Sequence, residues 1–345
     1  MAWNGDAHDA MGRSTFQVDI DAITRAVYDS GAKVVGLQLP EGLKRLALPM
    51  VESIEQATGA TVVLSADPCY GACDLVDDQF EPLDVQLIIH VGHSPLGDTE
   101  PRIPTIFLDA PSRLDIGPAV RASLYKLGRG GRIGLLTTTQ HRHAIRDARS
   151  ILENAGFEVA IGTGGKRLAF PGQVLGCDLS AARAVENEVD TFLIVGGGTF
   201  HAIGVAMSTR RPVVIADVET GEARTVQEDL DRVLRRRSAT IGAAMDAKTF
   251  GIIIEARPGQ RRWSLAQSLA DMLIDSGRRP VLMVLRNISP DRLVAIGLDA
   301  YVNTACPRLT IDDQSLFPMP LLTPVEMRIM LGRDGWDDYM MDEFD

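Results

Sequence analysis

The four cysteines of this 345-residue chain are the residues whose types and spacing could do chemistry. Cys69 and Cys73 form a Cys-x3-Cys pair after the apolar run Thr61–Leu64, whereas Cys177 and Cys306 stand in distant segments. Glycine or proline lies within two residues of Cys73, Cys177 and Cys306, which is typical of turns. Thiols that reach turns from three separated segments predict a site that is assembled in space.

Spacing alone leaves the role of these thiols open. The Cys-x3-Cys pair matches the start of the compact Cys-x3-Cys-x2-Cys loop of many radical enzymes, but the third position is Val76. Four cysteines in such a chain favour metal binding, catalysis or simple burial over a disulfide scaffold. A buried cysteine is more often an inert small hydrophobe than a ligand.

The composition predicts a cytoplasmic protein. Apolar residues make up 45% of the chain, but no stretch approaches the roughly 18–20 consecutive apolar residues of a membrane span. The first residues lack the basic and then apolar pattern of a signal peptide. The net charge is −11 and no basic stripe is present, so we expect no direct contact with nucleic acid.

The hydrophobic pattern predicts an α/β fold of three similar small domains in a pseudo-threefold arrangement. Short Val/Ile/Leu-rich strands alternate with helices, which is typical of mostly parallel sheets flanked by helices. The predicted domains are 1–125 with Cys73, 126–247 with Cys177 and a linking helix, and 248–345 with Cys306. The predicted strands are 34–39, 61–64, 87–91, 105–108, 132–137, 158–161, 192–195, 213–216, 251–255, 281–285, 300–304 and 321–322.

Segments at the domain edges carry separate expectations. Residues 1–14 are polar and aperiodic, which predicts a loose arm. A helical pattern at Glu222–Ala247 links the second and third domains, and its run Arg235–Arg237 is interpreted as a solvated face. The tail, Asp334–Asp345, is either disordered or docks as a lid. The polar cluster 140–143 is interpreted as a solvated loop unless the fold turns it inward.

Several segments around the cysteines closely resemble a known family. They are Tyr-Gly-Ala-Cys-Asp at 70–74, Val-Gly-His-Ser at 91–94, Pro-Gly-Gln-Val-Leu-Gly-Cys at 171–177 and Asn-Thr-Ala-Cys-Pro-Arg-Leu-Thr-Ile-Asp at 303–312. These segments are similar to those of the archaeal 2-(3-amino-3-carboxypropyl)histidine synthases, which carry out the first step of diphthamide biosynthesis. The resemblance covers residues 34–322, nearly the whole chain.

The resemblance implies a [4Fe-4S] cluster held by one cysteine from each domain: Cys73, Cys177 and Cys306. Three thiolates leave one iron open, whereas such clusters usually have four cysteine ligands. In the family, that iron takes the methionine end of S-adenosylmethionine, and one electron cleaves the bond from sulfur to Cγ. The resulting 3-amino-3-carboxypropyl radical adds to a histidine of translation elongation factor 2. The resemblance also implies a homodimer and an external electron donor.

Four residues are candidate contacts for S-adenosylmethionine. Glu41 could bind its amino group, or could simply begin a helix, where a negative charge suits the dipole. His93 faces either the substrate pocket or the carbonyls of its own loop. Gly197 lies in a glycine run that either lets backbone approach a ligand or makes a tight turn. His201 is either a substrate contact or a structural histidine.

Two other functions stay open, and so does the role of one thiol. A quinolinate synthase-like dehydratase also surrounds a [4Fe-4S] cluster with three α/β domains, but uses the open iron as a Lewis acid. A non-catalytic partner subunit of the same fold is expected to lack part of the cysteine set. The motifs at Tyr70–Cys73 and Cys306–Leu309 favour the transferase. Cys69 is expected to be an extra, structural thiol. The alternatives are a spare redox-active thiol or a ligand that competes for the cluster.

Overall fold

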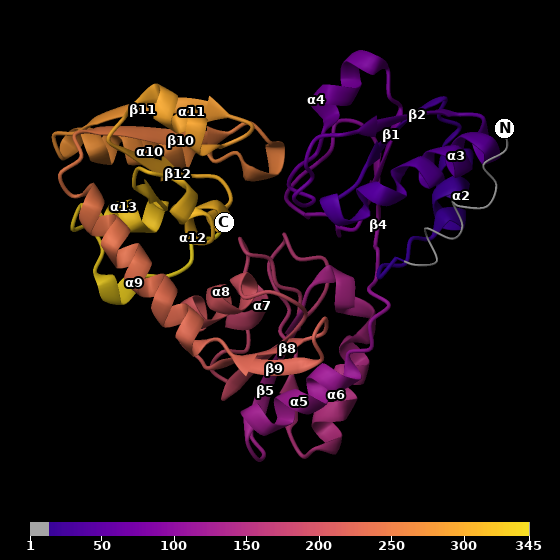
Figure 1. The fold of residues 1–345 in the computed structure, drawn as a ribbon, viewed down its shortest axis with the longest axis horizontal. Helices are drawn as coiled ribbons and strands as arrows, with labels where there is room; N and C mark the ends of the chain where they lie inside the picture. The colour runs from indigo at the N-terminus through magenta and orange to yellow at the C-terminus, as the bar shows by residue number, and fades with distance from the viewer. Residues whose placement is uncertain (1–13, 345) are drawn as a thin grey trace.

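Three β-sheets surround a common centre in the computed structural model, which describes residues 14–344 (Figure 1). The expected loose arm at 1–14 therefore lies, except for Ser14, outside the described residues. The strand orders are β2-β1-β3-β4, β6-β5-β7-β8-β9 and β11-β10-β12-β13. The first four strands of every sheet are parallel and follow one order. The predicted α/β fold with three mostly parallel sheets is confirmed.

The predicted strands are all present, to within two residues at each end. The strands are β1 Val34–Gln38, β2 Thr61–Ser65, β3 Leu87–Val91, β4 Thr105–Leu108, β5 Arg132–Thr137, β6 Glu158–Ala160, β7 Thr191–Val195, β8 Val213–Asp217, β9 Glu222–Thr225, β10 Thr249–Glu255, β11 Arg279–Leu285, β12 Ala300–Asn303 and β13 Leu321–Leu322.

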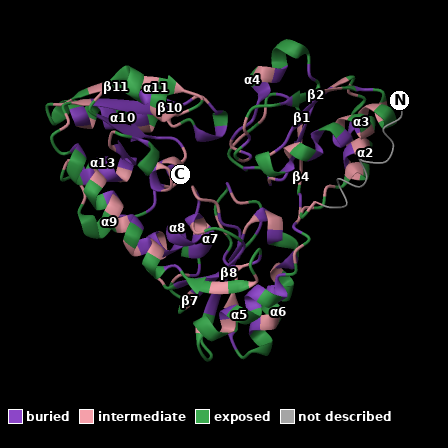
Figure 2. Cartoon of the chain, in the orientation of Figure 1, coloured by how far each residue is buried: buried purple, intermediate pink, exposed green. Residues whose placement is uncertain are grey.

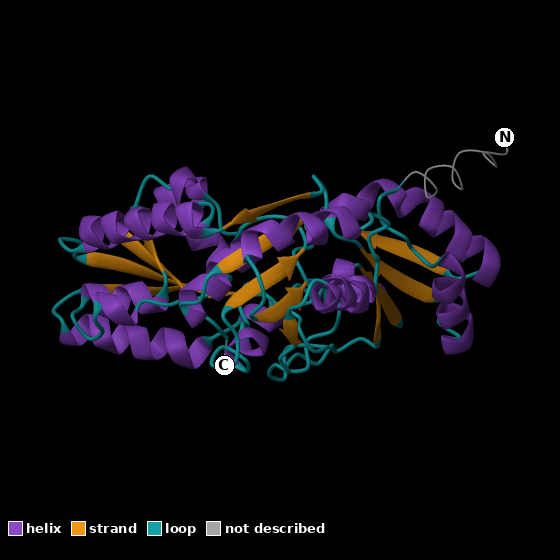
Figure 3. Cartoon of the chain, turned by 90° about the horizontal axis from the view of Figure 1, so that it is seen from below, coloured by secondary structure: helices purple, strands orange, loops and turns teal. Residues whose placement is uncertain are grey.

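The helices flank both faces of the sheets (Figure 3). They are α2 Ile20–Ser30, α3 Ala47–Thr58, α4 Asp77–Phe80, α5 Gly117–Leu127, α6 Ile145–Asn154, α7 Ser180–Arg183, α8 Phe200–Thr209, α9 Gln227–Ala244, α10 Trp263–Asp275, α11 Pro290–Ile296, α12 Pro307–Ile311 and α13 Pro324–Met330. Short 3-10 turns lie at Glu41–Leu46, Glu81–Leu83, Thr139–Ala144, Pro258–Gln260, Gln314–Leu316 and Trp336–Asp338. Within residues 14–344, no helix is both long enough and apolar enough to cross a membrane.

Each sheet has a buried apolar core on both of its faces (Figure 2). In the first sheet, for example, Ile23 and Met50 from α2 and α3 cover one face, and Phe80 from α4 covers the other. A parallel sheet needs this double cover because both faces of its strands are apolar. The cores are therefore separate, while the loops at the strand ends are free to meet at the centre.

A glycine in the first strand of each sheet makes room for an aromatic ring. A Cβ atom on Gly36 would lie 2.5 Å from the ring of Phe80, and one on Gly134 would lie 2.4 Å from Phe192. A Cβ atom on Gly251 would lie 2.5 Å from the ring of Tyr301. The same packing solution recurs in all three sheets, which agrees with the predicted internal similarity.

The predicted helix Glu222–Ala247 is wrong over its first residues. Glu222–Thr225 forms β9, which pairs antiparallel with β8 in the register Val214↔Thr225. The chain reverses at Gly221, which has φ 72° and donates its N–H to the carbonyl of Asp217. A left-handed turn at glycine returns the chain along the strand it has just left, so the helix begins only at Gln227.

The interpretation of the arginine run as a solvated face is also wrong for Arg237. Its side chain is fully buried and bonds both carboxylate oxygens of Glu326, at 2.7 and 2.5 Å. It also donates to the carbonyls of Thr310 and Leu321. Arg237 therefore fastens α9 to α13 and to the last strand of the third sheet.

The tail docks against the rest of the chain over its described residues, 334–344. Tyr339 and Met341 are buried in the core of the second sheet, and the N–H of Phe344 donates to the carbonyl of Cys177 at 2.8 Å. The predicted domain boundary after residue 125 falls within α5, which packs on β8 and β9. The division at 125 and 247 stays a prediction.

Candidate metal centre

Each of the three distant cysteines lies in a loop that follows strands of a different sheet. Cys73 lies between β2 and α4, Cys177 between β6 and α7, and Cys306 between β12 and α12. The carboxyl ends of parallel strands are where open α/β sheets place ligands. Figure 1 shows these loop regions converging at the centre of the molecule.

The three thiols are close enough to affect one another's protonation. Burial, with a smaller contribution from the neighbouring Cys306, raises the pKa of Cys73 to about 12. Burial also raises the pKa of Cys177, with Arg167 opposing and with Cys306 and Cys73 adding to the rise. None of the three forms a disulfide. The structure therefore brings together the three cysteines that the sequence singled out.

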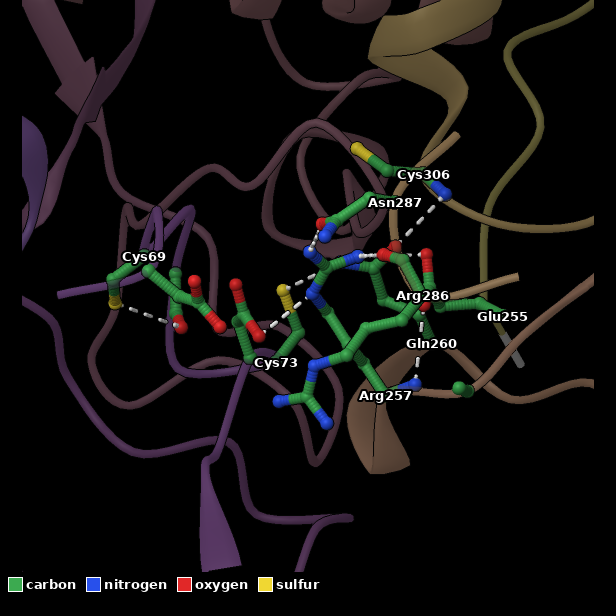
Figure 4. Close-up of polar contacts among 12 residues, drawn as sticks. Cys69, Cys73, Glu255, Arg257, Gln260, Arg286, Asn287 and Cys306 are labelled. Carbon is green, nitrogen blue, oxygen red and sulfur yellow. Dashed lines mark hydrogen bonds and ion pairs between the residues drawn. The ribbon is translucent and has the colours of Figure 1, made fainter. Parts of the chain in front are cut away.

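Gln260 links two of these cysteines (Figure 4). Its Nε2 donates to the Sγ of Cys73 at 3.2 Å, and its Oε1 accepts from the N–H of Cys306 at 3.2 Å. Gln260 ends the 3-10 turn Pro258–Gln260, whose Gly259 lies directly against Cys73. A Cβ atom at Gly259 would lie 2.5 Å from the Cα of Cys73. The turn can approach the first loop this closely only because the residue is glycine.

Arg257 joins the first loop to the third sheet (Figure 4). Its Nε donates to Oδ1 of Asp74 at 2.7 Å, and its remaining nitrogens bond Glu255 and Asn287 at 2.9 Å. All three charged side chains of this group are buried. Burial raises the pKa of the Asp74 carboxyl, while the Arg257 charge opposes the rise. Buried charges need this kind of pairing, and here the pairing crosses between domains.

Arg167 reaches into the same centre from the second predicted domain. It bonds Asp98 at 2.8 Å and the carbonyl of Gly259 at 3.0 Å. Its charge acts to lower the pKa values of Cys73 and Cys177. Sequence reasoning did not identify Arg167, Arg257 or Gln260, because nothing in their local sequence shows which distant loop they contact.

The donor set fits an iron–sulfur cluster. Three half-buried thiols from three loops, with a cation beside them, are suited to thiolate ligation, because a metal displaces the thiol proton. Among the described residues, the three sulfurs are not gathered as tightly as the ligands of one ion, and a cluster is larger than one ion. Two buried polar atoms at this centre, Asp74 Oδ2 and Arg167 Nε, have no hydrogen-bond partner. Unpaired buried polar atoms are rare and point to a missing partner.

The other predicted site residues are spread around this centre. The Glu41 carboxylate is exposed and pairs with Lys44 at 2.5 Å, at the start of a 3-10 turn. Gly197 follows β7, and a Cβ atom there would lie 3.6 Å from Oε1 of Glu219. His201 lies in the first turn of α8, where burial, with a smaller contribution from the charge of Arg308, lowers its pKa to about 4.

Two histidine-bearing loops turn inward. His93 bonds the neighbouring His90 through Nδ1 at 3.0 Å, so its partner is a side chain and not the carbonyls of its own loop. His141 is buried beside Gly196, and its Nδ1 has no hydrogen-bond partner. The solvated-loop interpretation of 140–143 therefore fails for His141, while Arg142 and His143 are exposed.

Comparison with known proteins gives one consistent result. Residues 39–340 match the family described as "Putative diphthamide synthesis protein". The chain is 37% identical over 318 residues to 2-(3-amino-3-carboxypropyl)histidine synthase of Pyrococcus horikoshii, covering 91% of this chain and 89% of that protein. It is 26% identical over 350 residues to the synthase of Methanocaldococcus jannaschii, covering 95% of each. The crystal structure of Dph2 from P. horikoshii with a 4Fe-4S cluster has a TM-score of 0.88 and 36% identity, covering 95% of this chain and 94% of that one.

Proposed function

This chain belongs to the diphthamide synthesis protein family and is an enzyme of that pathway, and on this premise we propose that it modifies a histidine of translation elongation factor 2. The group transferred is the 3-amino-3-carboxypropyl group of S-adenosylmethionine. The observation that carries the proposal is the meeting of three cysteines from three loops in a chain 36% identical to a protein crystallised with a 4Fe-4S cluster. Membership of this family favours transfer over dehydratase chemistry.

We propose that Cys73, Cys177 and Cys306 hold the cluster. When bound and reduced, the cluster supplies the electron that cleaves the bond from sulfur to Cγ of S-adenosylmethionine. The charge of Arg167 favours the thiolate forms of Cys73 and Cys177. The amide of Gln260 donates to the Sγ of Cys73, and hydrogen bonds to cluster sulfurs are one of the protein's means of setting the reduction potential.

The side chains around the thiols have a positioning task. The pair of Asp74 with Arg257 holds the residue next to Cys73 against the third sheet, and the N–H of Phe344 holds the carbonyl of Cys177. These contacts fix the loops that supply the ligands. A reactive radical also requires a site that excludes water, and the docked tail supports this exclusion because it lies beside Cys177.

Four residues are proposed contacts for S-adenosylmethionine. His201 is supported by its position near Arg308, two residues beyond Cys306. Gly197 is supported by its position at the end of a central strand, where backbone can approach a ligand. His93 is supported by its place in an inward-facing loop. Glu41 is the least supported, because binding an amino group requires its carboxylate to leave Lys44.

The partners follow from the reaction. The protein substrate is elongation factor 2, and a cytoplasmic location goes with it. An external donor reduces the cluster, because each cleavage of S-adenosylmethionine consumes one electron and that electron must be replaced. We also propose a homodimer, on the resemblance to the archaeal enzymes.

The test is anaerobic reconstitution with iron and sulfide, followed by dithionite, S-adenosylmethionine and archaeal elongation factor 2. We expect the paramagnetic resonance signal of a reduced [4Fe-4S] cluster, release of methylthioadenosine, and a mass increase on one histidine of the factor. Cys73→Ala, Cys177→Ala and Cys306→Ala should each lose the cluster signal and the product. His143→Ala changes an exposed ring and is the control. Full activity of Cys177→Ala would overturn the proposed ligand set.

A further inference from the structure

Three potential metal ligands gather in the first domain and take no part in the proposed cluster. They are Cys69, in the loop after β2, His90, in β3, and His93, just beyond β3. One ligand atom from each lies within 4.8 Å of the other two. Cys69 and His90 are buried and His93 is half-buried. Because their positions come from two separate segments, the grouping is a product of the fold and not of sequence proximity alone.

The hydrogen bonds around His90 fix which of its nitrogens carries the proton. Nε2 of Gln38 donates to the carbonyl of Asp74 at 2.5 Å, so its Oε1 is the atom that faces Nδ1 of His90 at 2.9 Å. An amide oxygen only accepts, and therefore Nδ1 of His90 carries the hydrogen. Nε2 of His90 is left with a lone pair, which points to Nδ1 of His93 at 3.0 Å.

This arrangement matches the outer shell of a metal-binding histidine. Such a histidine almost always donates its other ring N–H to an acceptor, which fixes its tautomer and orientation. Here Gln38 is that acceptor, and it is itself held by Asp74. The ring of His90 is also packed against Phe107, with 5.0 Å between centroids. His90 is thus oriented with the lone pair of its Nε2 toward His93.

The thiol of Cys69 has no strong partner of its own. Its hydrogen bond to the carbonyl of Gly71 is long, at 3.9 Å. Burial, and then the charge of Asp74, raise its pKa to about 12, so without a cation it stays protonated. Burial keeps both rings neutral, because it lowers the pKa of His90 well below its ordinary value and that of His93 to about 4. Neutral imidazole is the form that binds metals.

We propose that Cys69, His90 and His93 form a second metal site that binds one divalent cation of the Zn²⁺ type. One thiolate and two imidazoles are a common zinc ligand set, which leaves a fourth position for water. Two nitrogens on a tetrahedral zinc, with bonds of about 2.0–2.1 Å, lie about 3.3 Å apart, close to the 3.0 Å between His90 and His93. Binding sends the thiol proton to solvent, and the ring proton of His93 moves from Nδ1 to Nε2, which is the nitrogen that then remains for the proposed contact with S-adenosylmethionine.

The site has a direct consequence for the proposed cluster. Cys69 precedes Cys73 by four residues in one loop, while His90 is part of the central strand β3. A cation between them ties the loop that carries Cys73 to the end of the first sheet. The second site therefore orders a cluster ligand without belonging to the cluster.

The test uses the full chain in which Cys73, Cys177 and Cys306 are all replaced by Ala, so that Cys69 is the remaining thiol. Co²⁺ is the probe, because its absorption reports thiolate ligation and tetrahedral geometry. We expect one equivalent to bind with a thiolate-to-cobalt band, and Zn²⁺ to displace it. Adding Cys69→Ala should remove the band. Adding Gln38→Leu should weaken binding about 10–100-fold, as loss of an outer-shell partner does, while adding His143→Ala should change nothing.

A second measurement covers the case in which the triple replacement does not fold. The otherwise unaltered chain, purified without chelators and reconstituted, is analysed for iron and zinc. We expect about one zinc besides the cluster iron, and loss of the zinc in His90→Ala with His143→Ala unaffected. Iron present without zinc, or zinc unchanged in His90→Ala, would overturn the second site and leave the proposed function standing. Zinc present without iron would support the second site and count against the proposed cluster.

Discussion

The guanidinium of Arg257 meets the carboxylate of Asp74 at 2.7 Å, although 183 residues separate them in the chain. Asp74 is adjacent to Cys73. Arg257 lies two residues after the end of β10, the first strand of the third sheet. The contact therefore fixes the distance between two of the three domains at the point where the proposed cluster needs them to meet. Both side chains are buried, so water cannot replace either partner.

Arg257→Met should destabilise the protein by about 3–5 kcal/mol, because it leaves the carboxylates of Asp74 and Glu255 buried without their cation. The reconstituted variant should also hold less iron. Arg149→Met is the matched control, since Arg149 pairs with Glu153 at the same 2.7 Å but on an exposed helix surface. Exposed pairs contribute about 0–1 kcal/mol. Denaturant unfolding and iron analysis check both variants, and equal losses in the two would contradict the role given to burial.

Gly259→Ala should impair the site without any change of charge. The added Cβ atom would lie 2.5 Å from the Cα of Cys73, so either the turn Pro258–Gln260 or the first loop must move. Overpacking of this kind costs about 1–3 kcal/mol. Because Gln260 then loses its position between Cys73 and Cys306, we expect reduced iron content. The matched control is Gly242→Ala in α9, where a Cβ atom meets nothing within 4 Å. Full iron content in Gly259→Ala would show that the close approach is not needed.

The parallel strands were predictable from the sequence because they are short apolar runs, and buried parallel strands need that composition. Four helices were not predicted: α5 at Gly117–Leu127, α8 at Phe200–Thr209, α12 at Pro307–Ile311 and α13 at Pro324–Met330. In α8 seven of ten residues are buried, so it has no polar face to produce a helical period. The antiparallel strand β9 was missed because Glu222–Thr225 is mostly polar and lies at a sheet edge, so it has no apolar run to indicate a strand.

The candidate site was predictable only in part. The three cysteines carry a chemistry that can be recognised from residue type and from the surrounding motifs. Gln260 and Arg167 carry no such signal, because their roles depend on contacts with loops 187 and 69 residues away. Arg237 shows the same limit, since an arginine run is ordinarily solvated, and only the fold reveals that one member is buried against Glu326.

Replacing His141 should make the free energy of unfolding depend less on pH between about 6.5 and 4. Burial lowers the pKa of its ring to about 4 from 6.5, so between these values the unfolded chain binds a proton that the folded chain does not. Stability is therefore lost as the pH falls from 6.5 toward 4, by up to about 3 kcal/mol for a shift of this size. His141→Gln should lose less stability over this range than the parent, measured by denaturant unfolding at several pH values. The exposed His143→Gln should stay close to the parent profile, because burial and not the charge of His143 is the main cause of the lowered pKa of His141. Identical slopes in all three proteins would rule out the assignment.

Arg237→Met should destabilise the third domain strongly. The substitution keeps an apolar stem of similar length but leaves the buried carboxylate of Glu326 without its two hydrogen bonds, at 2.7 and 2.5 Å. Breaking one side of a buried pair costs about 3–5 kcal/mol. The double variant Arg237→Met with Glu326→Leu should recover part of this loss, because no unpaired charge remains, although Tyr339 then loses the carboxylate to which its hydroxyl donates at 2.6 Å.

Arg235→Met, two residues earlier on the same helix, is the control for this prediction. Its side chain is exposed, and substitutions at such positions usually change stability by no more than about 0.5 kcal/mol. Thermal and denaturant unfolding of the three variants and the parent give the comparison. If Arg235→Met and Arg237→Met were equally mild, the bonds from Arg237 to Glu326 would not be what fastens α9 to α13. A large loss in Arg237→Met alone, partly reversed in the double variant, is the result that a buried and mutually dependent pair requires.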